Sequence, residues 1–208
     1  MNSNIIRLRE LLNIIKNIKI KQIIFFSSSS VYGEYQKKII TENDIYKKQN
    51  IYGLSKIYGE KFFLNKFDQG VTCIRLPAIL TNNNYNHYIG SLIKKLMQNK
   101  NIILSNIKSK FNFFIDPINL LEFILDKKKL KKNHVINLCA DSTHSLYYIV
   151  NYMKKKLNSS SSIIYKKDIS KKIVLLSNKK AKKIYGFKPY DVKVSLANWI
   201  KKIGYEKN

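Results

Sequence analysis

The chain has 208 residues, of which 45% are hydrophobic, so it is long enough to bury the core of one domain. It carries 39 basic and 13 acidic residues, which give a formal net charge of +26 at pH 7. The basic residues are scattered along the chain and are nearly all lysine; arginine, the side chain best suited to bidentate phosphate contacts, occurs only as Arg7, Arg9 and Arg75. The composition therefore argues against a nucleic-acid-binding protein, although a Lys-rich protein of that class stays as a less favoured alternative.

The sequence also argues against a membrane protein and a metal site. No apolar run reaches the roughly 18 residues that a transmembrane helix needs, and the first residues lack the pattern of a secretory signal. Cys73 and Cys139 lie in apolar, strand-like runs and are predicted to be buried free thiols. No cysteines and histidines have the spacing of a zinc site. We therefore expect a cytoplasmic protein with no metal and no membrane contact.

The first 80 residues alternate between helical and strand patterns. Hydrophobic periodicity and flanking turn residues predict a helix at 4–18, a buried strand at 21–28, a polar loop at 33–50, a helix at 51–67 and a buried strand at 71–76. Strands that alternate with helices imply a parallel sheet with helical crossovers. The pattern is typical of the second half of a doubly wound, dinucleotide-binding α/β domain.

The rest of the chain gives shorter signals. They predict helices at 90–99, 145–157 and 194–203, strands at 102–104 and 133–138, and a helix that follows the segment 111–120 and continues to Lys129. Ser145 is a candidate N-cap, and Leu196, Trp199 and Ile200 are predicted to face the core. The serine run at 159–162 reads as a flexible surface linker.

Two motifs in the first third of the chain carry complementary chemistry. Four serines, Ser27 to Ser30, end the first predicted strand, and Tyr52 and Lys56 lie one turn apart on one face of the next helix. A free tyrosine has a pKa of about 10, and a neighbouring ammonium favours the phenolate by about 1 to 3 units. Each motif alone fits a surface pair or a loop. Together they predict a general acid/base that moves a proton between an alcohol and a ketone, with a nicotinamide cofactor as hydride acceptor.

These residues also carry a resemblance. Ser-Ser-Ser-Ser-Val-Tyr-Gly at 27–33, followed by Tyr-Gly-Leu-Ser-Lys at 52–56 and by Glu60, resembles the extended short-chain dehydrogenase/reductase superfamily, and within it the NAD-dependent sugar-nucleotide epimerase/dehydratase family. Thr-Glu-Asn-Asp at 41–44 resembles the segment that precedes the tyrosine in that family.

The resemblance implies roles for individual residues. Tyr52 is expected to be the acid/base, Lys56 to lower its pKa and bind the nicotinamide ribose, and Ser28 to be the catalytic serine, with Ser29 as the fallback. The expected cofactor is NAD or NADP, and the expected substrate is a nucleotide-activated sugar. The cofactor is expected to contact Ser28, Tyr52, Lys56 and Pro77.

The resemblance continues toward the C-terminus with departures from the family pattern. Asp116 stands where the family commonly has His, and Asn119 stands where it commonly has Asp. The segment 177–189 resembles one that packs the small substrate domain. These matches imply a cofactor-domain part at 1–80, which carries the Tyr/Lys pair, and a mainly substrate-binding region at 81–208, with 111–140 returning to the Rossmann-like sheet.

The glycine-rich turn that holds the cofactor pyrophosphate in this family does not occur in these residues. The seven glycines are not grouped, and the acidic residue that reads the adenosine ribose is also absent. The expected fold is therefore α/β: a partial doubly wound, Rossmann-like parallel sheet that lacks its first strands, plus a small C-terminal substrate domain. We expect a truncated or split member, for instance one that pairs with a separate N-terminal half, and an exposed edge on the strand at 21–28.

The sequence leaves the activity open. Dehydratases of the family usually carry Asp-Glu after the catalytic residue, and Ser29-Ser30 here favours an epimerase or a reductase. The alternative is a non-catalytic fragment or dimerising module, because the family forms homodimers through helices like those predicted at 4–18 and 51–67.

Overall fold

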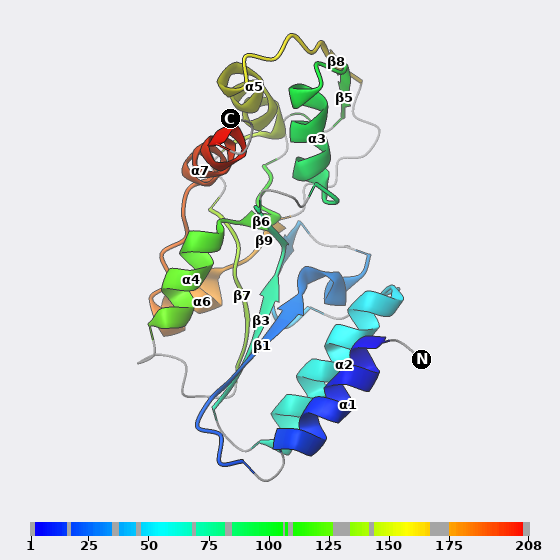
Figure 1. The fold of residues 1–208 in the computed structure, drawn as a ribbon, viewed down its shortest axis with the longest axis vertical. Coiled ribbons are helices and arrows are strands. Elements are labelled where there is room, and N and C mark those ends of the chain that lie inside the picture. Colours follow the sequence, from blue (N-terminus) through cyan, green and yellow to red (C-terminus); the bar gives the residue numbers. More distant parts are fainter. Residues whose placement is uncertain are drawn as a thin grey trace.

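The protein is described by a computed structural model that covers most of the chain, namely residues 3–15, 18–34, 38–44, 47–67, 70–81, 85–105, 107, 110–126, 134–141, 144–166 and 175–205. A central parallel sheet lies between two layers of helices, and a smaller helical part lies at one end (Figure 1). In the described residues the sheet has the strand order β1-β3-β7, and neighbouring strands run parallel. The strands are β1 (Ile23–Ser28), β3 (Val71–Leu76) and β7 (His134–Asn137).

Helices cover both faces of this sheet (Figure 1). Phe63 packs with Val71 and Cys73 on one face, and Ala181 packs with Ile74 and Leu76 on the other. The mixed α/β arrangement with parallel strands confirms the predicted fold class. The first face is covered by α1 (Ser3–Ile15) and α2 (Ile51–Lys66), and the second by α4 (Pro117–Leu125) and α6 (Lys179–Tyr185).

The strands differ in burial in a way that the sequence did not predict. All six residues of β3 are buried, as expected for a parallel strand with helices on both faces. The apolar half of β1 is only partly buried, and Phe26 is 44% exposed. The prediction of a buried strand at 21–28 is therefore wrong for its apolar residues, because β1 lies at the end of the described sheet. The expected exposed edge is consistent with this position.

The part at the end of the sheet has its own core. Helices α3, α5 and α7 pack around Trp199, which is 1% exposed and donates its indole N–H to the Thr81 carbonyl at 3.1 Å. The predicted helices and the strand at 102–104 are confirmed within two residues at their ends, and Ser145 is the N-cap that accepts from the Tyr148 amide. The elements are α3 (Tyr88–Met97), β5 (Ile102–Leu104), α5 (Leu146–Lys156), β8 (Ile163–Tyr165) and α7 (Val192–Tyr205).

Short parallel ladders join segments that lie far apart in the chain. The predicted loop at 33–50 contains β2, which pairs with β9 close to the C-terminal end. The short strand β4, which follows β3, pairs in parallel with the short strand β6, which precedes α4. In the same way β5 pairs with β8. Strands of two residues are too short to show a period, so the sequence did not predict them. They are β2 (Ile39–Ile40), β4 (Ala78–Ile79), β6 (Phe114–Ile115) and β9 (Leu175–Leu176).

The serine run at 159–162 is not a flexible linker. Ser159 and Ser161 are buried, and the Ser159 hydroxyl donates to the Leu96 carbonyl at 2.6 Å. The Ser160 amide donates to the Asn99 side chain at 2.9 Å. The run therefore ties the end of α5 to the end of α3, through the Ser159 hydroxyl and the Ser160 amide.

The C-terminal segment at 177–189 also differs from expectation. Ala181, Tyr185 and Phe187 share one buried cluster with Ile74 and Ile136 of the central sheet. The segment therefore packs against that sheet, and its expected place in a substrate domain is wrong.

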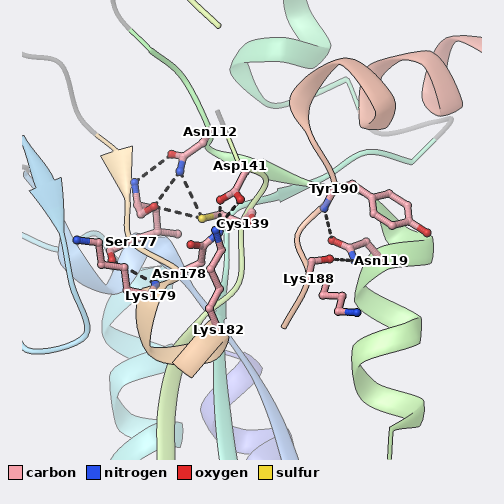
Figure 2. Close-up of polar contacts among 11 residues, drawn as sticks. Asn112, Asn119, Cys139, Asp141, Ser177, Asn178, Lys179, Lys182, Lys188 and Tyr190 are labelled. Atoms are coloured by element: carbon pink, nitrogen blue, oxygen red, sulfur yellow. Dashed lines mark hydrogen bonds and ion pairs between the residues drawn. The ribbon is translucent and has the colours of Figure 1, made fainter. Parts of the chain in front are cut away.

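Side-chain amides hold this segment to the sheet (Figure 2). Asn112 bonds to both backbone groups of Leu176, at 2.8 and 3.0 Å. Asn119 of α4 bonds to the backbone of two residues: it donates to the Lys188 carbonyl at 2.9 Å and accepts from the Tyr190 amide at 3.0 Å. Each amide pairs with one backbone N–H and one backbone C=O, so the two asparagines hold the chain on either side of α6.

A buried ion pair lies between β3 and α2. The Arg75 guanidinium binds both oxygens of the Glu60 carboxylate, at 2.7 and 2.9 Å, and the two side chains are 2% and 4% exposed. Burial opposes the charge on Arg75, but its hydrogen bonds and attraction to Glu60 outweigh this and raise the pKa of the guanidinium. The guanidinium therefore keeps its charge inside the protein.

The pair is the centre of a larger network. Ser27 of β1 donates to Glu60 at 2.5 Å, and Arg75 donates to the Tyr32 hydroxyl at 3.0 Å and to the Glu42 carbonyl at 3.1 Å. Burial raises the pKa of Tyr32, so this phenol keeps its proton and donates it to Asn137 of β7 at 2.7 Å. One network thus joins α2 and all three strands of the described sheet.

Both cysteines are free and buried, as predicted. Burial raises the pKa of the Cys73 thiol to about 12 and also raises that of Cys139. The Cys139 thiol donates to the Leu176 carbonyl at 3.2 Å (Figure 2). In the part of the chain that the structure describes, no helix is long and apolar enough to cross a membrane.

We expect neither thiol to react in the folded chain. The thiolate is the reactive form, and burial both withholds the reagent and raises the pKa of the two thiols. With Ellman's reagent at pH 8, the native protein should release no chromophore within minutes, and the protein in guanidinium should release two equivalents. A rapid reaction of one equivalent in the native protein would contradict the observed burial.

Substituting Glu60 should be far more damaging than substituting an exposed carboxylate. Glu60→Gln leaves the buried Arg75 charge without its partner, and we expect the free energy of unfolding to fall by about 3–5 kcal/mol in urea titrations. The matched control is Glu34→Gln, which breaks an exposed pair with Lys48 at 3.2 Å. That change should cost less than about 1 kcal/mol. Similar losses in the two variants would show that the buried pair has no special weight.

Candidate functional site

The serine-rich end of β1 turns directly into the helical turn η1 (Ser29–Tyr32). Ser28 is the N-cap of this turn: its hydroxyl oxygen accepts from the Ser30 amide at 3.1 Å and donates to the Ser30 hydroxyl at 3.2 Å. Ser28 and the fallback residue Ser29 are 8% and 9% exposed. The carboxyl end of β1 thus holds Ser28 in a buried position at the edge where parallel sheets bind ligands.

The start of α2 is set by Asn50, whose side chain accepts from the Gly53 amide at 2.8 Å. This N-cap puts Tyr52 in the first turn of the helix and Lys56 in the second. Gly53 then permits close packing, because a Cβ at this position would lie 2.4 Å from the Ser30 carbonyl oxygen. The first turn of α2 therefore rests on the backbone of η1.

Gly59 has the same function further along the helix. A Cβ at this position would lie 2.3 Å from the ring of Phe25 in β1. Gly53 and Gly59 together let α2 approach β1 and η1 more closely than a helix with side chains at these positions could. Our sequence reasoning did not assign these glycines a role, although two glycines inside a predicted helix are an available signal for close packing.

Tyr52 and Lys56 lie together on this helix. The Lys56 amine is 5.6 Å from the centroid of the Tyr52 ring and 5.3 Å from that of Phe25. It donates to the Phe26 carbonyl at 2.8 Å, two residues before Ser28. Burial lowers the pKa of Lys56. Tyr52 is 45% exposed.

Pro77 lies at the same edge of the sheet. Ser28 pairs with Leu76 in the β1–β3 ladder, and Pro77 follows Leu76 directly. The four residues singled out in the sequence therefore lie around the carboxyl ends of two neighbouring strands, on β1, on α2 and after β3. This edge is where an open parallel sheet binds its ligands.

The described residues fit one end of a dinucleotide cofactor and show no group of glycines that could hold its middle. The amine of Lys56 and the hydroxyl of Tyr52 can donate to a ribose, and Pro77 follows the neighbouring strand β3 at the same end of the sheet. A pyrophosphate, by contrast, needs clustered backbone N–H groups. Within the described residues, the three glycines with positive φ are Gly33, Gly70 and Gly186, which lie in separate turns. The residues present fit the nicotinamide riboside half.

The two departures from the family pattern have structural roles. Asp116 is the N-cap of α4, accepts from the Ile118 amide at 2.8 Å, and accepts from Asn198 at 3.1 Å. Asn119 holds the backbone on either side of Pro189 (Figure 2). A cluster of three or more His, Cys, Asp or Glu side chains that could hold a metal ion does not occur among the residues that the structure describes.

Known structures share this fold. UDP-glucuronic acid 4-epimerase from Bacillus cereus in complex with NAD aligns with a TM-score of 0.77 and 21% identity, over 96% of this chain and 68% of that chain. UDP-glucose 4-epimerase from Thermotoga maritima with UDP-glucose aligns with a TM-score of 0.78 and 18% identity, over 99% and 71%. RMD from Pseudomonas aeruginosa complexed with NADPH aligns with a TM-score of 0.73 and 18% identity, over 96% and 73%.

At these identities the structural likeness establishes the fold. A search of the curated protein sequences gives no match. The model of the NAD-dependent epimerase/dehydratase family matches residues 1–139, which is more than half of the chain and includes β1, α2 and β3. The chain therefore belongs to the NAD-dependent epimerase/dehydratase family.

Proposed function

We propose that this chain carries the acid/base half of an NAD(P)-dependent sugar-nucleotide epimerase or reductase. The observation that carries the proposal is the Lys56 amine, which lies 5.6 Å from the Tyr52 ring at the carboxyl end of β1. A cation at this position favours the phenolate of a tyrosine. Solved structures with the same fold are complexes with NAD, with NADPH and with UDP-glucose, which supports a cofactor and a nucleotide-activated sugar as ligands.

In this proposal the residues act at separate atoms. Tyr52 removes the proton from a sugar hydroxyl and returns it in the reverse direction. The Ser28 hydroxyl holds the same sugar oxygen, and Lys56 donates to the cofactor ribose and stabilises the Tyr52 phenolate. Pro77 borders the nicotinamide. The bound cofactor would supply a hydride acceptor at its nicotinamide ring.

The proposal also assigns the two parts of the chain. Residues 1–80 would belong to the cofactor domain, and 81–208 would mainly form the substrate region, with 111–140 returning to the sheet and 177–189 packed against it. The pairing of β7 with β3 supports that return. The core around Trp199, built from α3, α5 and α7, supports a separately packed substrate region. A pyrophosphate-binding turn would have to come from a segment outside these 208 residues, such as a separate N-terminal half.

A second candidate is a dimerising module without turnover. Apolar side chains are exposed on both helices of one sheet face, including Leu11 and Ile14 of α1, at 46% and 68%, and Leu54 of α2, at 52%. Such a face can pair with the same face of a second copy. This candidate is compatible with membership of the family. It differs from the first candidate because the chain would not bind the cofactor.

Cofactor binding and turnover test the first candidate. Titration calorimetry with NAD and NADP should show weak binding, because these residues carry no grouped glycines for the pyrophosphate. Tyr52→Phe should lower turnover of UDP-glucose by roughly a hundredfold or more while it leaves cofactor affinity nearly unchanged. Lys56→Met should lower both the turnover of UDP-glucose and the affinity for the cofactor. Because burial lowers the pKa of Lys56, affinity should fall with rising pH at a pH below the usual lysine range.

Tyr58→Phe is the matched control, since Tyr58 lies on the same helix and is 37% exposed. It should behave like the unmodified chain in both assays. No binding up to millimolar cofactor would mean that this polypeptide alone is not the enzyme and would favour the second candidate. Equal turnover of Tyr52→Phe and the unmodified chain would remove Tyr52 from the reaction.

The oligomeric state tests the exposed helical face. Light scattering after gel filtration should give the mass of a homodimer at micromolar concentration, and Ile14→Lys or Leu54→Lys should shift the population to monomer by at least tenfold in Kd. The control is Ile103→Lys, a change at an apolar side chain of β5 that is 56% exposed at the other end of the molecule. A monomer in the unmodified chain would exclude pairing through α1 and α2.

A further inference from the structure

Aromatic rings form a column along one side of α5. His144, which precedes the helix, is stacked on Tyr148, with ring centroids 4.2 Å apart and planes at 19°. One helical turn later Tyr152 continues the column, with its ring 6.2 Å from that of Tyr148 and planes at 14°. The three rings are therefore held nearly parallel by contact with one another.

Strand β8 adds a further ring to this surface, at the same end of the molecule (Figure 1). The Tyr165 ring lies 5.2 Å from that of Tyr147 in the first turn of α5. Asn151 joins strand and helix, because its side chain donates to the Tyr165 hydroxyl at 3.3 Å and to the Tyr147 carbonyl at 2.9 Å. Tyr147, Tyr148 and Tyr165 are nevertheless 46%, 37% and 41% exposed. These rings are fixed in position and open to solvent.

Lysines extend the same face of the helix. Lys154 lies seven residues after Tyr147, and Lys155 lies seven residues after Tyr148, so both follow the tyrosines along one side of α5. Lys155 is exposed and Lys154 is partly exposed. The sequences of α5, β5 and β8 contain no Asp or Glu. Exposed rings and positive charges therefore lie next to one another on the α5–β8 surface, formed by Tyr147, Tyr148, Tyr165, Lys154 and Lys155.

This combination of groups suits one class of partner. Bases of a single strand stack on aromatic side chains whatever their sequence, and lysines neutralise the phosphates that join them. An acidic peptide would pair with the lysines and leave the ring faces unused. Asp191 lies 3.6 Å from His144, at the end of the column away from the lysines, so phosphates would follow the lysine end.

The scarcity of arginine is compatible with such a partner. Arginine is the side chain for bidentate contacts with phosphates and base edges, and its near absence argued against a nucleic-acid-binding protein. Stacking on tyrosine needs no arginine and has little sequence preference. The local juxtaposition of rings and lysines, rather than the total charge of the chain, is what favours a nucleic acid here.

We propose that the α5–β8 surface binds single-stranded nucleic acid without sequence preference. Bases stack on the exposed rings of Tyr147, Tyr148 and Tyr165, and the phosphates between them contact Lys154 and Lys155. The surface shares no residue with the candidate site on β1 and α2. This binding is therefore independent of the proposed acid/base function.

Fluorescence anisotropy with the full chain and a labelled oligothymidylate of about 12 nucleotides tests the proposal at physiological ionic strength. We expect binding with a micromolar Kd. Tyr148→Leu keeps an apolar side chain but removes the ring face, and it should raise the Kd by at least about fivefold, as expected for the loss of one stacked base. Tyr148→Phe keeps the ring face and should bind as the unmodified chain does.

Matched variants on α2 separate this surface from the rest of the chain. Tyr58 is also 37% exposed, and Tyr58→Leu should leave the Kd unchanged. Changing both Lys154 and Lys155 to Met should lower the slope of log Kd against log salt concentration by about 1.4, since each phosphate contact of a single strand contributes about 0.7. Lys61→Met, at an exposed lysine of α2, should leave that slope unchanged.

Three results would overturn the proposal. One is the absence of binding at physiological ionic strength. Another is an equal Kd for Tyr148→Leu and the unmodified chain, which would leave charge as the sole cause of binding. The third is displacement of the labelled strand by polyglutamate as efficiently as by unlabelled oligothymidylate, which would assign the surface to an acidic protein segment. None of these results bears on Tyr52, whose role the turnover of Tyr52→Phe decides separately.

Discussion

The ion pair between Arg75 and Glu60 is the contact on which the rest of the arrangement depends. Two buried charges cost several kcal/mol to remove from water, and they are tolerated only when geometry and further hydrogen bonds satisfy them. Here the bidentate contact, the Ser27 hydroxyl and the Tyr32 hydroxyl provide this. Glu60 lies one helical turn beyond Lys56, and Ser27 precedes Ser28. The pair therefore fixes the register of α2 against β1, and with it the position of the candidate site.

Close approach of the helix to the strand completes that positioning. Side chains at Gly53 and Gly59 would overlap with the Ser30 carbonyl and the Phe25 ring, so these two positions let α2 pack directly on η1 and β1. This close approach also positions Lys56 of the candidate site. At this separation the Lys56 amine reaches the strand backbone and still lies beside the Tyr52 ring. A helix displaced by the width of one side chain could not make both contacts.

The sheet itself is unequal across its width. β3 is covered on both faces, whereas β1 presents one open edge and the half-exposed ring of Phe26. The candidate site has the same asymmetry. The groups that suit a nicotinamide riboside lie at the carboxyl end of β1, and the described residues show no cradle for a pyrophosphate.

The sequence by itself determined the local elements and the chemistry of the site. Helices and long strands have a period, so α2, β3 and α7 were predicted with their ends nearly correct, and the spacing of Tyr52 and Lys56 placed them on one helical face. The tertiary structure alone decided the two-residue ladders, the burial of the serine run at 159–162 and the contact of Lys56 with the Phe26 carbonyl. These depend on segments far apart in the chain, and local periodicity carries no information about such contacts.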